Sequence, residues 1–277
     1  MGLVMRFYTY EIQSPVLKPY IQFLLFNYCN DPSSNNTITY YPNNDVCLGI
    51  IHQKELVSCN NTFTLQDSDI PVNSYLTGIY TKPHTLTVNG TFDEICLPFT
   101  PVGYYHFFRL PLKQYILGED VLTEAFGTSS AFFFEKLFGE DITKRGNLIE
   151  LFLLSKLESF QDNFLKLSLQ YLADALDDTS LAAINTKLNC SERKLQRVFS
   201  QKLDITPKEY IQVMKFRRAL RYMGMNPSNT LTGICYEVDY YDQSHFIRNI
   251  KRYTGKKPGD LIRQIKSIDQ KVLVSLT

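Results

Sequence analysis

The most informative part of this sequence is the run YYDQSHFIRNIKRYTGKKP, residues 240–258. Its apolar side chains Phe246 and Ile250 are four residues apart, which places them on one face of a helix. Asp242 precedes this pattern and has the short acceptor side chain that is typical of a helix N-cap. We therefore expect an amphipathic helix over 242–253, and its opposite, polar face carries Gln243, Ser244, Arg248, Lys251 and Arg252.

The same plan occurs a second time upstream. Residues 190–199 read CSERKLQRVF, in which the apolar face holds Leu195, Val198 and Phe199 and the polar face holds Arg193, Gln196 and Arg197. Each run follows a short helix and a tight turn, so the two units span 181–202 and 230–253. One unit alone would also fit a solvated amphipathic helix. Two units joined by a long helix over 206–224 favour paired helix-turn-helix units whose second helices offer Arg and Gln to base edges in the major groove.

Start and stop signals predict helices throughout the last third of the chain. Ser191, Thr206 and Asp242 are suited to N-caps, Pro207 fits the first turn of a helix, and the run 226–229 breaks the long helix from the next. We expect helices near 164–177, 181–188, 191–202, 206–224, 230–238, 242–253 and 258–267.

Charge is distributed unevenly along the chain. Of the 29 Lys+Arg and 28 Asp+Glu residues, 10 and 16 fall in residues 1–159, and the remaining 19 and 12 fall in residues 160–277. The two parts therefore carry net charges of −6 and +7, which sum to the +1 of the whole chain. Such an asymmetry indicates a basic module that meets a polyanion, attached to an acidic module that does not.

Residues from about 165 to 267 resemble the DNA-binding domain of the AraC/XylS family of bacterial transcription regulators. Besides the two runs quoted above, the resemblance rests on ITPKEYI at 205–211 and RRAL at 217–220. It implies an all-α domain of seven helices, in which two recognition helices enter successive major grooves and the long helix holds them apart. The sequence departs from the family pattern at four positions, where the family usually has Gly, Ala, an aromatic residue and Arg and this chain has Asp239, Cys235, Ile250 and Lys215.

The resemblance also implies a role for individual side chains, carried over by position. Base edges would be contacted by Arg193, Gln196 and Arg197 in the first unit and by Gln243, Ser244, Ile247 and Arg248 in the second. Phosphates would be contacted by Lys194, Lys251, Arg252 and Lys256. Each lysine has the alternative of a solvated surface charge. Arg197 has the alternative of an ion pair to Glu192 or Glu209, and for His245 we expect a packing or capping role.

The first third of the chain is typical of a β domain, because short runs of β-branched and aromatic residues alternate with turn residues. We expect a strand and turn in 35–45 and further strands near 21–28, 46–51, 76–80, 85–88 and 92–100, forming a sandwich or a partly open barrel. The runs at 15–21, 41–48, 77–83 and 90–103 resemble the β-rich sensor domain of some AraC-type regulators. This resemblance implies a cupin-like barrel with a helical tail and does not identify an effector or its binding residues.

From about residue 111 the pattern becomes helical, with helices expected at 112–118, 120–126, 130–138 and 145–160. The predicted fold class is therefore α+β with several domains: a β-rich cupin-like sensor domain at 1–110, a helical bridge at 111–160 and an AraC-type DNA-binding domain at 161–277. Three consecutive phenylalanines, Phe132, Phe133 and Phe134, cannot all face one core. We expect them to divide between two packing surfaces within the chain, and a dimer contact is the alternative.

A cupin-like barrel raises the alternative of a metal-dependent enzyme fused to a DNA-binding module. Catalytic cupins gather two or three histidines and a carboxylate, whereas His52, His84 and His106 are isolated in this sequence. The sequence contains no nucleophile elbow, no phosphate loop and no Cys-x-x-Cys pair, and its six cysteines are expected to be free thiols. We therefore expect no catalytic residue, metal or cofactor. A DNA-bending architectural protein is a second alternative, and it would show poor sequence preference.

No apolar run approaches the roughly 20 residues that span a bilayer, and the first residues lack the plan of a secretion signal, so we expect a cytoplasmic protein with no membrane partner. The expected partners are double-stranded DNA at a promoter site, a small-molecule effector, RNA polymerase and a second copy of the chain. Together these features predict a sequence-specific DNA-binding transcription regulator that is controlled by a small molecule bound in its N-terminal domain.

Overall fold

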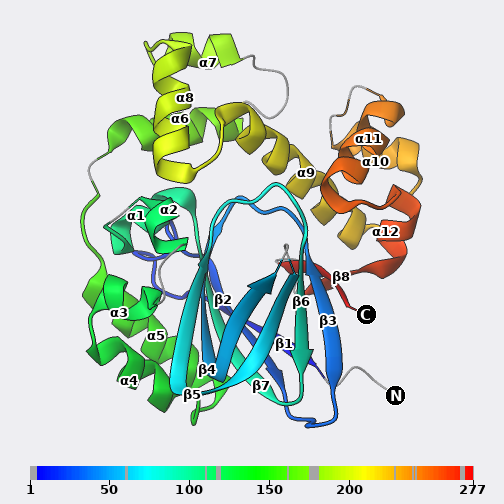
Figure 1. Cartoon of the computed structure of the whole chain (residues 1–277). Coiled ribbons are helices and arrows are strands. Elements are labelled where there is room, and N and C mark those ends of the chain that lie inside the picture. The colour runs from blue at the N-terminus through cyan, green and yellow to red at the C-terminus, as the bar shows by residue number, and fades with distance from the viewer. Residues whose placement is uncertain are drawn as a thin grey trace. The chain divides into compact units, whose positions relative to one another are not determined.

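The computed structural model describes residues 5–59, 62–109, 111–116, 120–160, 162–174, 181–227, 229–238, 240, 242–268 and 272–276. The fold is α+β (Figure 1), and it divides into two compact units. Unit 1 comprises Met1–Asn36, Asp45–Gly78 and Leu86–Gln161, and unit 2 comprises Thr37–Asn44, Ile79–Thr85 and Asp162–Thr277. Two stretches of the expected sensor domain, 37–44 and 79–85, thus lie in unit 2, and the expected bridge lies in unit 1.

Unit 1 contains an antiparallel sheet whose strands run in the order β1-β2-β7-β4-β5. The bounds of these strands are β1 (Arg6–Glu11), β2 (Phe23–Cys29), β4 (Val46–Cys59), β5 (Thr62–Thr77) and β7 (Phe92–Phe99). Phe26 lies opposite Ile95, which lies opposite Ile50, and all three are fully buried. The sheet therefore packs a continuous apolar row on one of its faces. Strand β1, residues 52–59 of β4 and residues 62–75 of β5 were not expected from the sequence.

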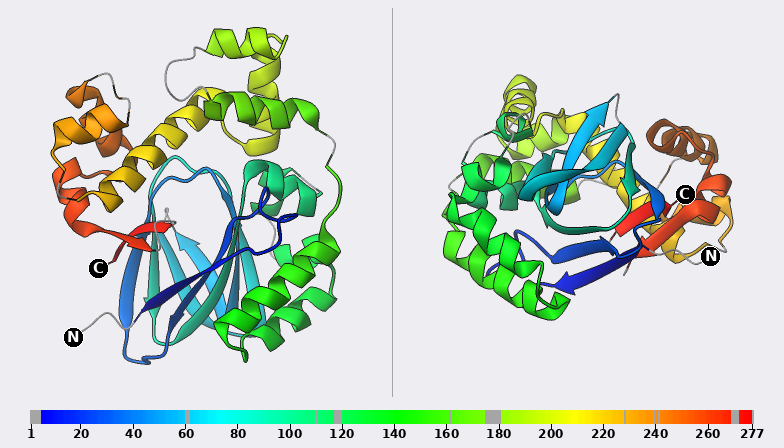
Figure 2. Two further views of the ribbon diagram at one scale, coloured as in Figure 1. Left: turned by 180° about the vertical axis from the view of Figure 1, so that it is seen from behind. Right: turned by 60° about the horizontal axis from the view of Figure 1, so that its bottom comes forward.

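Five helices of unit 1 follow the sheet in the chain: α1 (Pro101–Phe107), α2 (Leu112–Ile116), α3 (Val121–Phe126), α4 (Ser129–Leu137) and α5 (Ile142–Lys156). Helix α1 was not expected from the sequence. It begins after Thr100, where the threonine side chain accepts a hydrogen bond from the backbone of Gly103. Helices α3 and α4 contact β5, and α5 contacts β1. Views from other directions show these helices gathered beside the strands (Figure 2).

The three consecutive phenylalanines divide differently from the expectation, because two pack within the chain and one is exposed. Phe134 is fully buried, and the ring of Phe133 stacks on that of Phe152 with their centroids 4.7 Å apart. Phe132 is 60% exposed, and the ammonium of Lys136 lies 4.1 Å from its ring centroid. One of the three side chains is thus left on the surface of α4.

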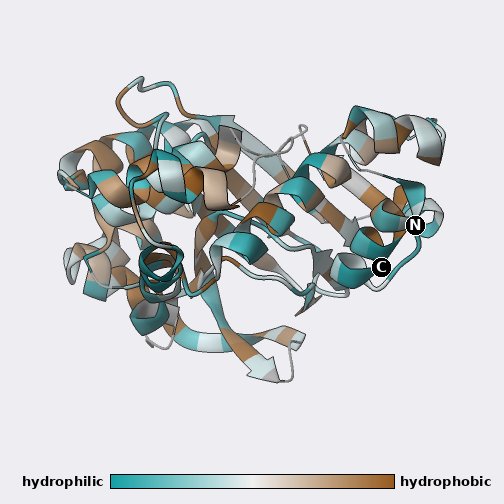
Figure 3. Ribbon diagram, turned by 90° about the horizontal axis from the view of Figure 1, so that it is seen from above, coloured by the Kyte–Doolittle hydropathy of each residue, from teal (hydrophilic) through white to brown (hydrophobic). Residues whose placement is uncertain are grey.

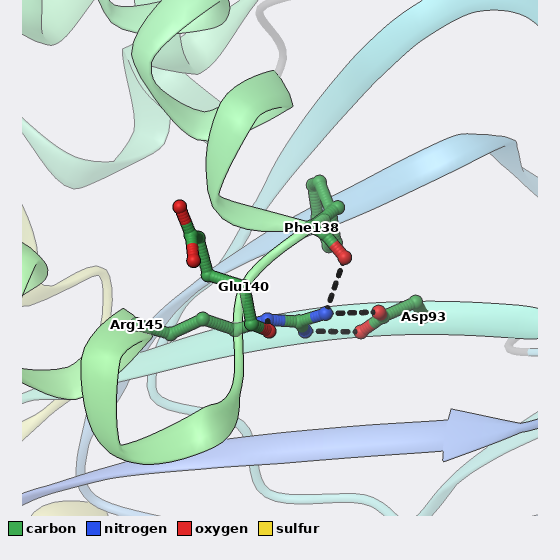
Figure 4. A network of polar contacts seen from close by, with 4 residues as sticks. All are labelled: Asp93, Phe138, Glu140 and Arg145. Atoms are coloured by element: carbon green, nitrogen blue, oxygen red, sulfur yellow. Dashed lines mark hydrogen bonds and ion pairs between the residues drawn. The ribbon is translucent and has the colours of Figure 1, made fainter.

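Arg145 joins α5 to the sheet (Figure 4). Its guanidinium donates two hydrogen bonds to the carboxylate of Asp93 on β7, at 2.8 and 2.7 Å. The same side chain donates to the carbonyl oxygens of Phe138 and Glu140, at 2.6 and 2.9 Å. The buried guanidinium is therefore matched by acceptors from β7 and from the α4–α5 turn, which fixes the position of this turn on β7.

Unit 2 contains the seven helices that the sequence predicted, each within a few residues of its expected bounds. They are α6 (Asn163–Asp174), α7 (Leu181–Lys187), α8 (Glu192–Leu203), α9 (Pro207–Met225), α10 (Leu231–Glu237), α11 (Gln243–Thr254) and α12 (Pro258–Gln264). Their core is aromatic and aliphatic, and Phe199, Phe216, Leu220, Phe246 and Tyr253 are fully buried within it.

Two strands extend this helical set, in contrast to the all-α domain expected. Helix α12 ends at Gln264 rather than at 267, and β8 (Ile265–Ile268) follows at once. It pairs antiparallel with β9 (Val272–Leu276), which in turn pairs with β3 (Asn35–Tyr40). The partner strand is more than 200 residues away in the sequence, so local patterns could not reveal it. The remaining strand, β6 (His84–Asn89), has residues in both units, as does β3.

Within the described ranges, no helix is both long and apolar enough to cross a membrane.

Candidate nucleic-acid interface

Helix α8 is the second helix of the first helix-turn-helix unit. Ser191 caps it by accepting a hydrogen bond from the backbone of Lys194 at 3.2 Å. Leu195 and Phe199 are buried, whereas the side chains expected to contact DNA are exposed: Arg193, Lys194, Gln196 and Arg197. In the turn before α8, Asn189 adopts a positive φ of 47°, a conformation that asparagine tolerates better than most residues. The helix therefore presents one polar face away from its core.

Arg197 is not held by either acidic residue considered as its ion-pair partner. Glu192 accepts a hydrogen bond from Nε2 of Gln196 at 2.8 Å. Glu209 accepts one from the hydroxyl of Thr206 at 2.7 Å, as part of the capping box of α9. Among the described residues, Arg197 has no ion pair, so its guanidinium is available to a ligand.

Two of the expected phosphate contacts have neighbours within the domain. The Lys194 ammonium lies 4.3 Å from the ring centroid of Phe164 on α6. The Lys256 ammonium donates to Oε1 of Gln264 at 2.5 Å. Both contacts place the charged group near the surface, and neither neutralises its charge.

Helix α11, in the second helix-turn-helix unit, has the same arrangement as α8. Its N-cap Asp242 accepts a hydrogen bond from the backbone of His245 at 2.7 Å. Phe246, Ile250 and Tyr253 are fully buried. The expected DNA contacts Gln243, Ser244, Arg248, Lys251 and Arg252 are exposed, and Ile247 is half-buried.

A buried polar cluster holds α11 against α9, and it was not predicted from the sequence. Asn249 is only 6% exposed, and its Oδ1 accepts a hydrogen bond from the hydroxyl of Tyr240 at 2.8 Å. Its Nδ2 donates to Oε1 of Gln212 on α9 at 3.3 Å. Burial raises the pKa of Tyr240, so the hydroxyl keeps the proton that it donates. The sequence feature that could have predicted this cluster is Asn249 itself, an asparagine at an apolar position of an amphipathic helix.

His245 and two of the four departures from the family pattern, Cys235 and Ile250, lie on or against the same helix. The ring of His245 lies 5.3 Å from that of Tyr240, which agrees with the packing role expected for it. Cys235 and Ile250 are both core residues, and burial raises the pKa of the Cys235 thiol. Asp239 lies outside the described residues.

Helix α9 links the two helix-turn-helix units within unit 2. Figure 1 shows α8 near its beginning and α10 and α11 near its end. It has 19 residues, which corresponds to a length of about 28 Å at 1.5 Å per residue. It contacts α6, α8, α10 and α11. This length is close to one turn of B-DNA, about 34 Å, which separates successive major grooves on one face of the duplex. Hydrophilic and hydrophobic residues alternate around the helices, as Figure 3 shows.

The three histidines of the expected sensor domain are engaged separately. His52 stacks on Phe138, His84 lies against Tyr80, and Nδ1 of His106 is 2.7 Å from the carbonyl oxygen of Glu158. In the part of the chain that the structure describes, no group of three or more His, Cys, Asp or Glu residues could hold a metal ion.

Residues 184–264 match the sequence profile of a helix-turn-helix domain family. The chain is 28% identical over 120 residues to the transcriptional activator RhaS of Escherichia coli, covering 41% of this chain and 43% of RhaS. It is 30% identical over 84 residues to the Msm operon regulatory protein of Streptococcus mutans, covering 30% of each chain. The C-terminal helices form an AraC/XylS-type helix-turn-helix domain.

The matches to the AraC/XylS-type relatives span less than half the length of RhaS and of the Msm regulator. Among solved structures, ToxT of Vibrio cholerae is similar over 94% of this chain and 97% of its own, with 11% identity and a TM-score of 0.41. A ToxT structure with bound unsaturated fatty acid covers 93% of this chain and 94% of its own, with 13% identity and a TM-score of 0.38.

Proposed function

We propose that this chain is a sequence-specific DNA-binding transcription regulator. The observation that carries the proposal is the repeated geometry of α8 and α11. Each helix buries its apolar face in unit 2 and exposes guanidinium and amide groups on the other, and the 19-residue helix α9 lies between them in the chain. Such a protein would act in the cytoplasm, where bacterial DNA lies, and RNA polymerase would be a further partner.

Control by a small molecule is the second part of the proposal. It is supported by the association of the AraC/XylS-type domain with an acidic unit that contains a curled sheet, because concave β structures supply enclosed sites for small ligands. A thermal-shift screen of the full chain against metabolites tests this part. A compound that raises the melting temperature and changes DNA affinity would support effector control, and a compound that changes neither would not.

We also propose that the protein forms a homodimer through unit 1. Helices α4 and α5 expose Phe132 (60%), Leu151 (64%) and Leu154 (38%). These large apolar side chains would lose contact with water in a dimer.

The DNA-binding proposal is tested by selecting bound duplexes from a random pool with the full chain and sequencing them. We expect one preferred site with two clusters of specified base pairs about one helical turn apart. Affinity should fall steeply with salt, because each phosphate contact releases counterions. Binding without base preference would instead support the architectural alternative.

Lys251→Ala serves as the matched comparison for the base-contacting residues. It should weaken binding to every sequence alike and reduce the slope of log affinity against log salt concentration by about 0.9. A loss of preference at one base pair in this variant would contradict the phosphate role.

A further inference from the structure

The strands that follow α12 connect the second helix-turn-helix unit to a distant part of the chain. Helix α12 contacts α11, and its C-cap residue Ile265 is also the first residue of β8. Both β8 and β9 contact α9. The hairpin formed by β8 and β9 therefore continues directly from α12. It rests on α9, the helix that joins the two helix-turn-helix units.

The outer edge of this hairpin pairs with β3. Val274 lies opposite Tyr40, and Ser275 lies opposite Thr39. Val274 and Ser275 are buried, as is Ile38 on β3. The hydroxyl groups of Tyr41 and Ser275 are 2.6 Å apart and hydrogen-bonded, and Tyr41 is only 1% exposed. The contact is thus a strand pairing with its own small core and a buried polar bond.

The pairing with β3 adds a third strand to a short hairpin that also rests on α9. Its strands have four and five residues, and an isolated two-stranded hairpin of that length is marginal in water. β3 supplies the third strand, in which Tyr40 lies opposite Val274. The segment 37–44 is continuous at both ends with unit 1, because the chain passes between the units at 36/37 and again at 44/45. A change in the strands of unit 1 can therefore act on β3 through the covalent chain.

We propose that the β8–β9 hairpin is a coupling element, which docks on β3 and thereby makes the order of α11 and α12 depend on segment 37–44. When the hairpin is docked, α12 is held at its C-terminal end and supports the recognition helix α11. When β3 shifts, the hairpin loses its third strand, and α11 loses that support. This inference rests on the proposed function only for its consequence at DNA.

The first test measures hydrogen–deuterium exchange in the full chain. Tyr41→Phe combined with Ser275→Ala removes the buried polar bond with little change in volume, and Val274→Asp places a charge in the small core. We expect both variants to exchange at least fivefold faster in 265–276 and also in α11 and α12, a coupling within the usual range. Ser267→Asp, at an exposed position of the same hairpin, is the control and should exchange like the natural protein.

Faster exchange confined to 265–276 and 37–44, with α11 and α12 unchanged, would overturn the proposal. The double variant decides the question even if Val274→Asp fails to fold.

The second test measures base preference in the same variants. We expect the base preference to weaken at the cluster of base pairs contacted by α11, with about fivefold to tenfold lower affinity for the site. The base preference at the cluster contacted by α8 should persist. Equal loss at both clusters would show general destabilisation and contradict the coupling. If the natural protein shows no base preference at all, the proposed function fails, and the exchange measurement still decides whether the hairpin supports α11.

Discussion

Arg197 and Arg248 occupy comparable places on α8 and α11, exposed beside a buried phenylalanine. A guanidinium can form two hydrogen bonds with one guanine, worth about 1–3 kcal/mol of discrimination. We expect Arg197→Ala and Arg248→Ala each to relax preference at one or two base pairs, in different clusters of the bound site. Selection from random duplexes measures this.

Arg263→Ala is the matched control, because this arginine lies on α12 and pairs with Asp260 at the surface. It should leave base preference unchanged. Arg197 would be structural instead if Arg197→Ala lowered the melting temperature markedly while base preference stayed intact.

His84 makes the stability of the fold depend on pH. Burial lowers the pKa of His84 below its ordinary value of 6.5, so the unfolded chain takes up this proton more readily than the folded protein. We therefore expect the free energy of unfolding to fall as the pH drops through 6.5 and below. Chemical denaturation at several pH values should show a smaller decrease in the free energy of unfolding for His84→Gln than for the natural protein.

At the scale of single elements, α5 depends on the ion pair between Arg145 and Asp93. The Arg145 side chain is 8% exposed, so removing it leaves a partly buried carboxylate without its cation. We expect Arg145→Ala to lower the free energy of unfolding by about 3–5 kcal/mol. Arg109→Ala breaks the ion pair between Arg109 and Glu158, whose two side chains are 78% and 58% exposed. This variant should lower the free energy of unfolding by less than about 1 kcal/mol. Similar costs for the two variants would refute the anchoring role of Arg145.

The exposed apolar side chains of α4 and α5 give the proposed dimer a specific test. Leu151→Glu would place a charge in the contact, and we expect it to shift the mass measured by light scattering from dimer to monomer. Ile70→Glu changes an equally apolar and exposed side chain on β5 and should leave the mass unchanged. A natural protein that is already monomeric at micromolar concentration would exclude this dimer.

At the scale of the whole molecule, the fragment 162–264 contains every helix of the AraC/XylS-type domain but not the hairpin. We expect it to bind the selected site with strong salt dependence, because the basic face is complete. Its α11 should exchange amide hydrogens faster than in the full chain, since α12 no longer continues into β8. A fragment that fails to bind even at low salt, although its circular dichroism is helical, would contradict the assignment of DNA binding to these helices.

The helices of unit 2 were predictable because their determinants are local. Caps at Ser191, Thr206 and Asp242 lie within a few residues of the helices that they start, and the apolar period identifies the buried face. The exposed sides of α8 and α11 follow from the same period. The sequence therefore predicted which of their side chains face away from the core, although it could not exclude ion pairs such as those considered for Arg197.

Contacts between distant segments were decided only by the tertiary structure. Strand β9 pairs with β3, which lies far away in the sequence, and Arg145 is buried because Asp93 lies across from it in space. Asn249 is tolerated in the core because Tyr240 and Gln212 satisfy its amide. A hydrogen-bond partner or a strand edge has no fixed spacing along the chain, so local periodicity contains no record of it, whereas helix caps and apolar faces are set by residues within one or two turns.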